Sequence, residues 1–380
     1  MSTDVTAGEL LDRAARLRPV LRERAAECER LRRVPSETVK DLVAAGLVRI
    51  GTPERYGGHG LDIDTGHAVA WELGRACGST AWCCSLWIVH NWWLGHFPEA
   101  AQAEFFAEGP DTLSSTCLNP AGGRAEVVSG GFRVSGRWSF SSGCDASRWA
   151  MVSVPGATPG STRWLLLPRE DYEIVDTWFA SGMRGTGSND IVVHDRLVPD
   201  HRALDPDRAG EPERVGWELH RRPSYRVPLR LLTGWDLAAP LVGIAQGAVD
   251  EFTERVRVRG GETVALQLRL AEAAAEVDAA RTIHRRTVGA LIARATAGER
   301  FGELDRARTR RDKAFVARLC VQAVNRLFEG AGARAIAESE PLQRFHRDAH
   351  AASHHAALAW DGAAEAYGRT ALTRTGLDNP

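Results

Sequence analysis

Residues 132–140 read Phe132-Arg133-Val134-Ser135-Gly136-Arg137-Trp138-Ser139-Phe140, with apolar side chains at every second position. A period of two residues is typical of a β-strand with one buried face. Val127-Val128 and the turn Gly130-Gly131 come directly before this stretch and predict a hairpin. Further short runs rich in Val, Trp and Leu predict more strands at 149–154, 164–167 and 191–193. We therefore expect a β domain at residues 113–222.

The residues before this β domain have a helical pattern. Leu10, Ala14, Leu17 and Leu21 keep helical spacing, and the Gly-rich stretch 53–60 predicts a turn between helices. We expect an N-terminal helical domain at residues 1–112.

The residues after the β domain are rich in alanine and also helical. The sequence predicts a four-helix bundle at residues 223–380, with helices near 234–258, 262–296, 303–334 and 340–372. The fold class is therefore α+β, with helices, then a barrel-like β domain, then a bundle.

Charge and cysteine content exclude several classes of protein. The 48 Lys and Arg against 49 Asp and Glu give a net charge of -1, which offers no general attraction for nucleic acid or an anionic membrane. No signal segment or long apolar span is evident, so we expect a cytoplasmic protein. The seven cysteines include no Cys-x-x-Cys pair. This argues against a disulfide framework or a thiolate metal site.

Six motifs follow one another in order along the chain. They are Arg55-Tyr56-Gly57-Gly58, Glu72-Leu73-Gly74 through Trp82, Asn119-Pro120-Ala121-Gly122, Gly136-Arg137-Trp138 through Gly143, Gly182 through Asp190, and Arg347-Asp348. In this order the chain resembles the acyl-CoA dehydrogenase superfamily, and more closely its two-component flavin-dependent monooxygenase branch. That branch includes p-hydroxyphenylacetate hydroxylase oxygenases and nitrososynthases. The resemblance implies an acyl-CoA dehydrogenase-like fold and a homotetramer.

A dehydrogenase of this superfamily needs a carboxylate base against its thioester substrate. In the dehydrogenases that this chain resembles, a Glu usually lies eight residues after the Asp of the Arg-Asp pair, and that position is Ala356 here. The nearest acid on an earlier helix, Asp236, fits the spacing poorly. An acyl-CoA dehydrogenase is therefore an alternative that the sequence disfavours.

Two histidines, together with Ser142, are the expected catalytic residues. The resemblance selects His355, five residues before Trp360-Asp361, and its imidazole can exchange a proton near neutral pH. It also selects His90, which would orient or deprotonate the substrate. His346, His350 and His354 recur every four residues, but we interpret this stripe as a polar helix face and expect no metal.

The resemblance also assigns residues around a flavin. It places Ser142, or as second choice Ser141, at flavin N5, and Asn119 beside the ring. The hydroxyls and backbone of Thr186 and Ser188 suit a flavin edge or phosphate, and Gly330 and Gly332 lie in the segment that resembles the diphosphate site of the dehydrogenases. The Gln that the dehydrogenases have is Val264 here, so FMN and FAD both stay open.

The function implied is hydroxylation of a small phenolic substrate through a C4a-hydroperoxyflavin, with reduced flavin and O2 as reactants. N-hydroxylation of an amine or amino sugar by the same intermediate is the alternative. No GxGxxG nicotinamide motif follows a strand. We therefore expect a separate NAD(P)H:flavin reductase as partner.

Overall fold

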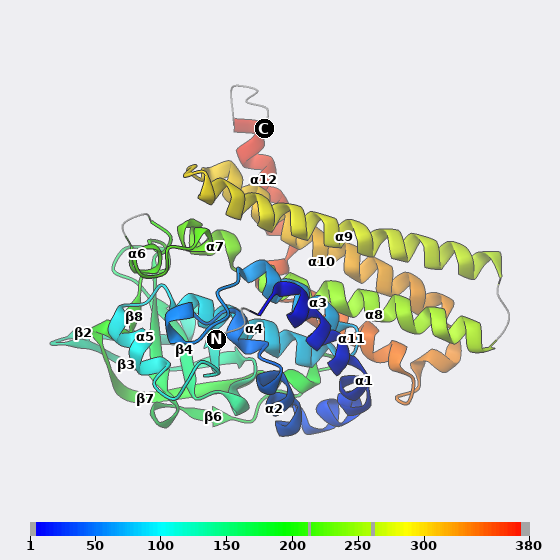
Figure 1. Cartoon of the computed structure of the whole chain (residues 1–380), viewed down its shortest axis with the longest axis horizontal. Helices are drawn as coiled ribbons and strands as arrows, with labels where there is room; N and C mark the ends of the chain where they lie inside the picture. The colour runs from blue at the N-terminus through cyan, green and yellow to red at the C-terminus, as the bar shows by residue number, and fades with distance from the viewer. Residues whose placement is uncertain (1–4, 212–213, 260–262, 374–380) are drawn as a thin grey trace.

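A computed structural model describes residues 5–211, 214–259 and 263–373 of the chain. Helices come first, two sheets follow, and a second group of helices ends the chain (Figure 1). The expected α+β order is confirmed. The exact domain limits stay a prediction.

The N-terminal helices surround one apolar helix. They are α1 (Ala7–Leu31), α2 (Ser36–Ala44), α3 (Ile63–Gly74), α4 (Gly78–Leu94) and α5 (Glu99–Phe105). The side chain of Thr6 begins α1 by accepting the backbone N–H of Glu9, and the Glu9 carboxylate accepts the N–H of Thr6. All seventeen residues of α4 are buried. This explains why apolar side chains predominate on every side of α4.

The middle of the chain forms two four-stranded sheets. One has the order β1 (Ser114–Cys117), β4 (Trp149–Pro155), β5 (Thr162–Pro168), β8 (Ala203–Leu204). The other has the order β2 (Gly123–Val128), β3 (Gly131–Ser141), β7 (Asn189–Pro199), β6 (Glu173–Val175). The stretch 132–140 lies in β3, which pairs with both β2 and β7, and its inward residues Val134 and Trp138 help form a core for this region.

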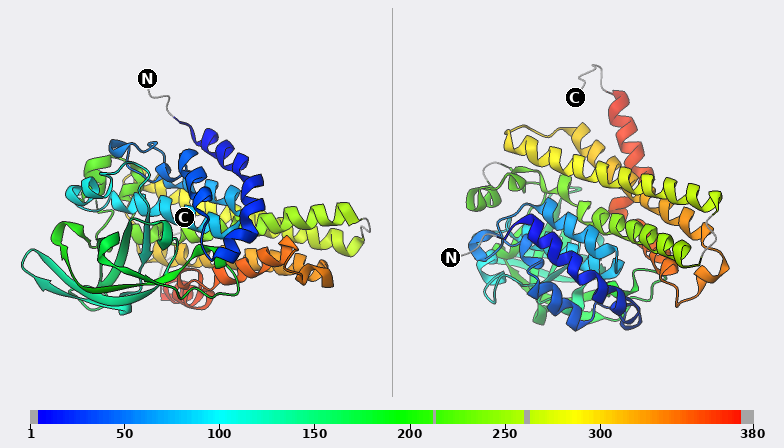
Figure 2. Two further views of the ribbon diagram at one scale, coloured as in Figure 1. Left: turned by 90° about the horizontal axis from the view of Figure 1, so that it is seen from below. Right: turned by 45° about the vertical axis from the view of Figure 1, so that its right-hand side comes forward.

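The C-terminal helices are mostly long. They are α6 (Val215–His220), α7 (Leu229–Leu232), α8 (Trp235–Arg259), α9 (Val264–Thr296), α10 (Glu303–Gly330), α11 (Pro341–Ser353) and α12 (Trp360–Thr373). Helices α8, α9 and α10 run side by side in Figures 1 and 2, and α11 packs against α8 and α10. Among the described helices, none is long and apolar enough to cross a membrane.

The fourth predicted helix, 340–372, is wrong as a single helix. It is broken into α11, the short 3-10 helix η10 (Ala356–Leu358) and α12. At the break, Nδ1 of His355 accepts the backbone N–H of Ala357 at 3.1 Å. A side chain that bonds its own backbone competes with helix continuation. His355 and Ala359 therefore do not share a helix face with Ala351, as a continuous helix would require.

Candidate active site

A chain of hydrogen bonds joins α4 to the loop between β6 and β7. Trp82 Nε1 donates to Ser142 Oγ at 3.2 Å, and Ser142 Oγ lies 2.8 Å from Ser188 Oγ. Ser188 Oγ lies 2.6 Å from Thr186 Oγ1, whose hydroxyl donates to the Met183 carbonyl at 2.8 Å. Each hydroxyl has one proton, so the donors run in the order Trp82, Ser142, Ser188, Thr186. Ser142 therefore keeps a free lone pair but no free proton.

An irregularity in β3 sets the direction of Ser141 and Ser142. The pairing of β3 with β7 shifts between Trp138 and Ser141, and Phe140 has a φ of 70°. Positive φ at a residue with a bulky side chain is strained, and strained residues cluster at active sites and ligand-binding sites. The bulge lets the two successive serines reach different partners: Ser141 Oγ donates to Ser115 Oγ of β1 at 2.9 Å, while Ser142 faces Trp82.

His355 lies beside this chain of hydrogen bonds. Its ring centroid is 6.0 Å from that of Trp82, and the residue is exposed on one side. Since Nδ1 accepts the N–H of Ala357, the neutral ring has its proton on Nε2. Desolvation by the packed protein atoms, and then the charge of Lys313, lower the pKa of His355 even though part of the residue faces solvent. The ring is thus a neutral hydrogen-bond donor at neutral pH.

Lys313 brings a buried ammonium to this region from α10. Its Nζ donates to the Thr233 carbonyl at 2.6 Å, and burial lowers the pKa of Lys313 to about 8. A methyl group added at Gly234 would lie 3.0 Å from this Nζ and 3.2 Å from Cβ of Ala357. Asp236, the acid considered as an alternative base, accepts the N–H of Gly234 at 2.8 Å, and burial raises its pKa to about 6. Its carboxylate therefore caps the start of α8.

His90 forms a second cluster with strand β1. Its Nδ1 lies 2.7 Å from the Ser114 carbonyl and its Nε2 lies 3.1 Å from Oγ1 of Thr116. A carbonyl only accepts, so Nδ1 carries the proton and Nε2 accepts from the Thr116 hydroxyl. Burial lowers the pKa of His90 to about 4, and the ring is neutral at physiological pH. The predicted catalytic histidine is thus a buried, neutral ring whose Nε2 accepts a hydrogen bond from a hydroxyl.

The two clusters lie along one helix. His90 follows Trp82 by eight residues of α4, which is a rise of about 12 Å along the helix axis. Strand β1 also links them, since Ser115 contacts Ser141 and its neighbours Ser114 and Thr116 hold His90. His90, Ser141, Ser142, Thr186, Ser188 and His355 are therefore brought to one region.

The Arg347-Asp348 motif holds the loop before β7. Asp348 Oδ1 accepts the N–H of Met183 at 2.6 Å, and Arg347 donates to the Ser181 carbonyl at 2.7 Å and pairs with Glu29. A Cβ at Gly182 would lie 2.1 Å from the Arg347 carbonyl oxygen, so only glycine fits there. The motif positions the loop that carries Thr186 and Ser188.

The structure does not bring the other predicted flavin residues into this group. Asn119 is exposed, and its Oδ1 accepts the N–H of Ala121 to cap the 3-10 helix Pro120–Gly122. Gly330 ends α10 and Gly332 follows it with a φ of 73°. Both lie at the bundle end where α8 and α9 meet, since Gly330 lies against Arg269 and Phe252. Their roles stay predictions.

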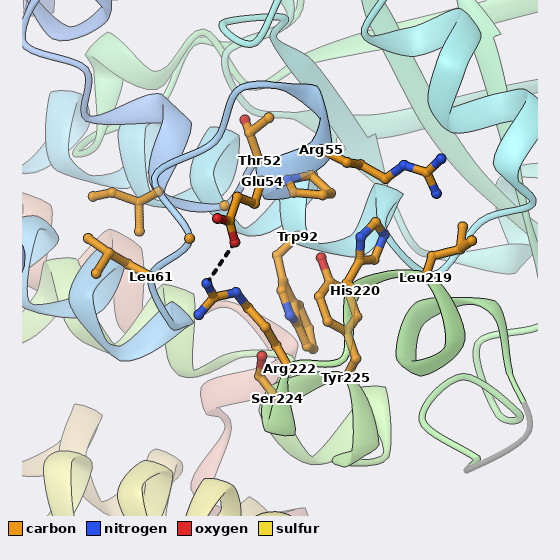
Figure 3. A pocket seen from close by; sticks show the side chains of 14 residues that line it. Thr52, Glu54, Arg55, Leu61, Trp92, Leu219, His220, Arg222, Ser224 and Tyr225 are labelled. Atoms are coloured by element: carbon orange, nitrogen blue, oxygen red, sulfur yellow. Dashed lines mark hydrogen bonds and ion pairs between the residues drawn. The ribbon is translucent and has the colours of Figure 1, made fainter. Parts of the chain in front are cut away.

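A cavity of about 340 Å³ opens between residues 50–61 and residues 219–225 (Figure 3). Trp92 and Tyr225 are stacked in its lining, with ring centroids 5.7 Å apart, and Arg222 forms an ion pair with Glu54 at 3.1 Å in the same lining. Trp92 follows His90 by two residues, or about 200° around the helix. The cavity therefore lies on the other side of α4 from the Thr116 contact, and none of the predicted site residues lines it.

The sequence did not predict the contacts that three residues make in this site: Trp82, Thr116 and Lys313. Trp82 lies in an apolar run with three other tryptophans, which is typical of a core. The only signal for Thr116 was the hydroxyl-rich run 114–116. In the described ranges, no three His, Cys, Asp or Glu side chains form a group that could hold a metal ion.

The residues present fit the edge of a flavin ring, which carries both hydrogen-bond donors and acceptors. The Ser142 lone pair can accept an N–H, and the Nε2–H of His355 can donate to an oxygen or nitrogen atom. The indole of Trp82 adds an aromatic surface between them. The donor set therefore agrees with a bound flavin.

Comparison with known families agrees with this chemistry. The family model "Acyl-CoA dehydrogenase, N-terminal domain" matches residues 11–107, and "Acyl-CoA dehydrogenase, C-terminal domain" matches residues 236–360. Together the two models cover more than half of the chain.

Individual relatives give a narrower class. The chain is 38% identical to the flavin-dependent monooxygenase, oxygenase subunit HsaA, of Rhodococcus jostii, over 91% of this chain and 94% of the relative. It is 34% identical to the FADH(2)-dependent resorcinol hydroxylase, oxygenase component, of a Rhizobium species, over 96% and 94%. The crystal structure of 3-HSA hydroxylase from Rhodococcus sp. RHA1 superposes with a TM-score of 0.92 at 37% identity, covering 97% of this chain and 98% of that one. The chain therefore belongs to the acyl-CoA dehydrogenase family and, within it, to the oxygenase components of two-component flavin-dependent monooxygenases.

Proposed function

We propose that this oxygenase component hydroxylates a small phenolic substrate next to its hydroxyl group, and that His90 and Thr116 take the phenol proton. Reduced flavin, FMN or FAD, supplies the electrons that activate O2. An oxygenase component receives that flavin from a separate reductase, which we expect to use NAD(P)H. Two relatives named above are an HsaA oxygenase subunit and a resorcinol hydroxylase component, and resorcinol is a phenol.

The observation that carries the proposal is the bond between Thr116 and His90. The Thr116 hydroxyl donates a hydrogen bond to Nε2 of His90, so a lone pair on its oxygen is open to a hydrogen bond from a substrate hydroxyl. As the phenol proton moves to Thr116, the Thr116 proton moves to His90. A phenolate is more electron-rich than a phenol, and its ring is a better nucleophile toward an electrophilic oxygen. His90 is neutral and its Nε2 lone pair faces Thr116, so it can take this proton. Because its pKa is lowered to about 4, the transfer is uphill, and it is completed only as the phenolate is consumed.

His355 is proposed as the proton donor on the flavin side. Its neutral ring offers Nε2–H, and the Lys313 ammonium disfavours a second proton on the same ring. Ser142 would hold an N–H of the flavin ring through its free lone pair, and the buried side chain of Trp82 would help to keep water from that edge. Ser141 stays the second choice for this contact because its hydroxyl faces Ser115.

The remaining proposals concern assembly. Gly330 and Gly332 lie at the far end of the bundle from Ser142, so we propose that they contact a flavin bound to another copy within a homotetramer. Asn119 would face the flavin ring only after its cap to Ala121 opens. We propose the cytoplasm as the location, because the reductase needs NAD(P)H there.

A direct test supplies reduced flavin without a reductase. Photoreduced FMN or FAD is mixed with the protein, 18O2 and either a phenol such as resorcinol or a primary amine, and the products are analysed by mass spectrometry. We expect a phenol to gain one labelled oxygen atom. If every phenol gives only hydrogen peroxide, oxygen consumption is not coupled to hydroxylation and the proposal is overturned. If only the amine gains labelled oxygen, the reaction is N-hydroxylation.

A further inference from the structure

A second cavity, of about 510 Å³, opens between α1, α3 and α9. We name it the α3–α9 cavity. Its wall includes Leu11 from α1, His67 and Trp71 from α3, and Arg281 and His284 from α9. It shares no residue with the proposed active site, and its volume is within the range of small-molecule sites.

Several polar atoms in the wall of the α3–α9 cavity lack a hydrogen-bond partner in the described chain. These atoms are both ring nitrogens of His67, Nε1 of Trp71 and Nε of Arg281. The His67 residue is only 2% exposed. Buried polar groups are nearly always bonded, and each one left alone costs about 1–3 kcal/mol. Each of these three side chains offers an N–H donor, so the cavity is suited to a molecule with acceptor atoms.

The charge around the α3–α9 cavity favours an anion. Arg75 is neutralised by Asp250 at 2.8 Å and Glu72 at 3.4 Å. Arg281 binds the amide oxygen of Gln246 through Nη2, and no acid of the described residues pairs with it within 4 Å. Arg285 also lines the cavity and forms no ion pair within 4 Å among the described residues, although its charge acts on Asp64. Two acids line the cavity: Glu72, which pairs with Arg18 and Arg75, and Asp64, whose pKa is raised by burial, which weakens its negative charge.

The inner wall of the α3–α9 cavity is aromatic. The His284 ring makes edge contacts with His67, at a centroid distance of 4.9 Å, and with Trp71, at 5.3 Å. Leu11 and Val288 add apolar surface. A flat ring packs well against such a wall. An aromatic wall beside the guanidinium group of Arg281 fits an aromatic carboxylate better than it fits a phosphate or a metal ion.

The same wall contacts the start of α8. His284 Nε2 lies 3.1 Å from the Trp235 carbonyl oxygen, and the two rings are 4.9 Å apart. Trp235 follows Gly234, the residue that packs against Lys313. A ligand that moves His284 therefore acts on the turn next to the proposed active site.

We propose that the α3–α9 cavity is an effector site for a small aromatic carboxylate, whose carboxylate pairs with Arg281 while its ring packs on Trp71 and His67. The site is distinct from the one that binds the substrate.

Benzoate, which has no phenol hydroxyl, is a suitable probe for calorimetry with the full assembled protein. We expect saturable binding of one benzoate per chain. Arg281→Gln should weaken it at least tenfold, and His67→Phe should weaken it several-fold. Arg30→Gln, at an exposed α1 arginine outside the cavity, is the matched control and should bind as the unmodified protein does. Circular dichroism checks that each variant is folded, and Arg281→Lys, which keeps the charge, should retain part of the affinity.

Three outcomes would overturn the inference. They are no saturable binding at millimolar benzoate, binding unaffected by Arg281→Gln, and a change of oligomeric state in Arg281→Gln, which would mean that a second copy covers the cavity. Binding that is lost in His90→Ala and kept in Arg281→Gln would place benzoate at the proposed active site. The effector site would then be wrong while the proposed function could stand.

Discussion

The indole nitrogen of Trp82 lies 3.2 Å from the hydroxyl oxygen of Ser142 and donates a hydrogen bond to it. This bond begins the chain that continues through Ser188 to Thr186, and it fixes which way the Ser142 proton points. The same indole lies beside His355. One side chain of α4 thus sets the positions of groups from two other parts of the fold.

Trp82→Phe tests this arrangement. The variant keeps an aromatic ring but removes the donor, so the lost hydrogen bond should lower the free energy of unfolding by about 1 kcal/mol. Ser142 should then turn, and reduced flavin should bind several-fold more weakly. Urea unfolding and a flavin titration measure the two effects, with Trp217→Phe in α6 as control. Unchanged flavin binding in Trp82→Phe would contradict the assigned role.

Thr116→Val tests the proton route to His90. Valine has nearly the shape of threonine but no hydroxyl, so the phenol proton has no path to Nε2 of His90. A positioned acid or base is worth a factor of about 10²–10⁴ in rate, and we expect hydroxylation of a phenol to slow by at least the lower figure. Thr116→Ser restores the hydroxyl and should recover most of the rate. Product formation in a single turnover is the measurement, and equal rates in the Val and Ser variants would rule out the relay.

His355→Ala should separate oxygen use from product formation. Without the Nε2–H donor, the reduced flavin should still react with O2, but more of the oxygen should leave as hydrogen peroxide. We expect the ratio of product to consumed O2 to fall several-fold, measured with an oxygen electrode and by chromatography. The neighbour His354 is exposed and bonds the His350 carbonyl, so His354→Ala is the matched control. A full yield in His355→Ala would show that the ring only caps the turn at Ala357.

The sequence predicts features that depend on neighbouring residues better than contacts between residues far apart in the chain. The family resemblance selects His90, Ser142 and His355, whose roles stay predictions, and the alternation at 132–140 correctly predicts β3. The contact of Thr116 with His90 depends on how β1 lies against α4, which no local pattern encodes. The break at His355 is hidden in an alanine-rich stretch with high helix propensity, because the capping bond to Ala357 outweighs that propensity only at this position. The buried Lys313 comes from a helix whose remaining pattern is that of an ordinary bundle.

His96 gives a prediction about acid stability. It is 4% exposed, neither ring nitrogen has a partner in the described chain, and the ring packs between Trp92 and Tyr225, each at 4.9 Å. Burial, with a smaller effect of His220, lowers the pKa of His96 to about 3. In the unfolded chain the ring takes up a proton below about pH 6.5, while in the folded protein it stays neutral. Acidification from about pH 6.5 toward 3 therefore favours the unfolded state at this residue.

His96→Phe removes this titration while keeping an aromatic ring of similar size. The free energy of unfolding of the variant, relative to the unmodified protein, should rise by about 2 kcal/mol between about pH 7.5 and pH 5, because one pKa unit corresponds to about 1.4 kcal/mol. Using the change between two pH values removes any constant packing cost in the variant. Urea unfolding at each pH supplies the numbers, and His194→Phe, at an exposed histidine of β7, is the matched control. If the difference for His96→Phe is the same at both pH values, His96 is protonated in the folded protein and its ring must have a partner in solution.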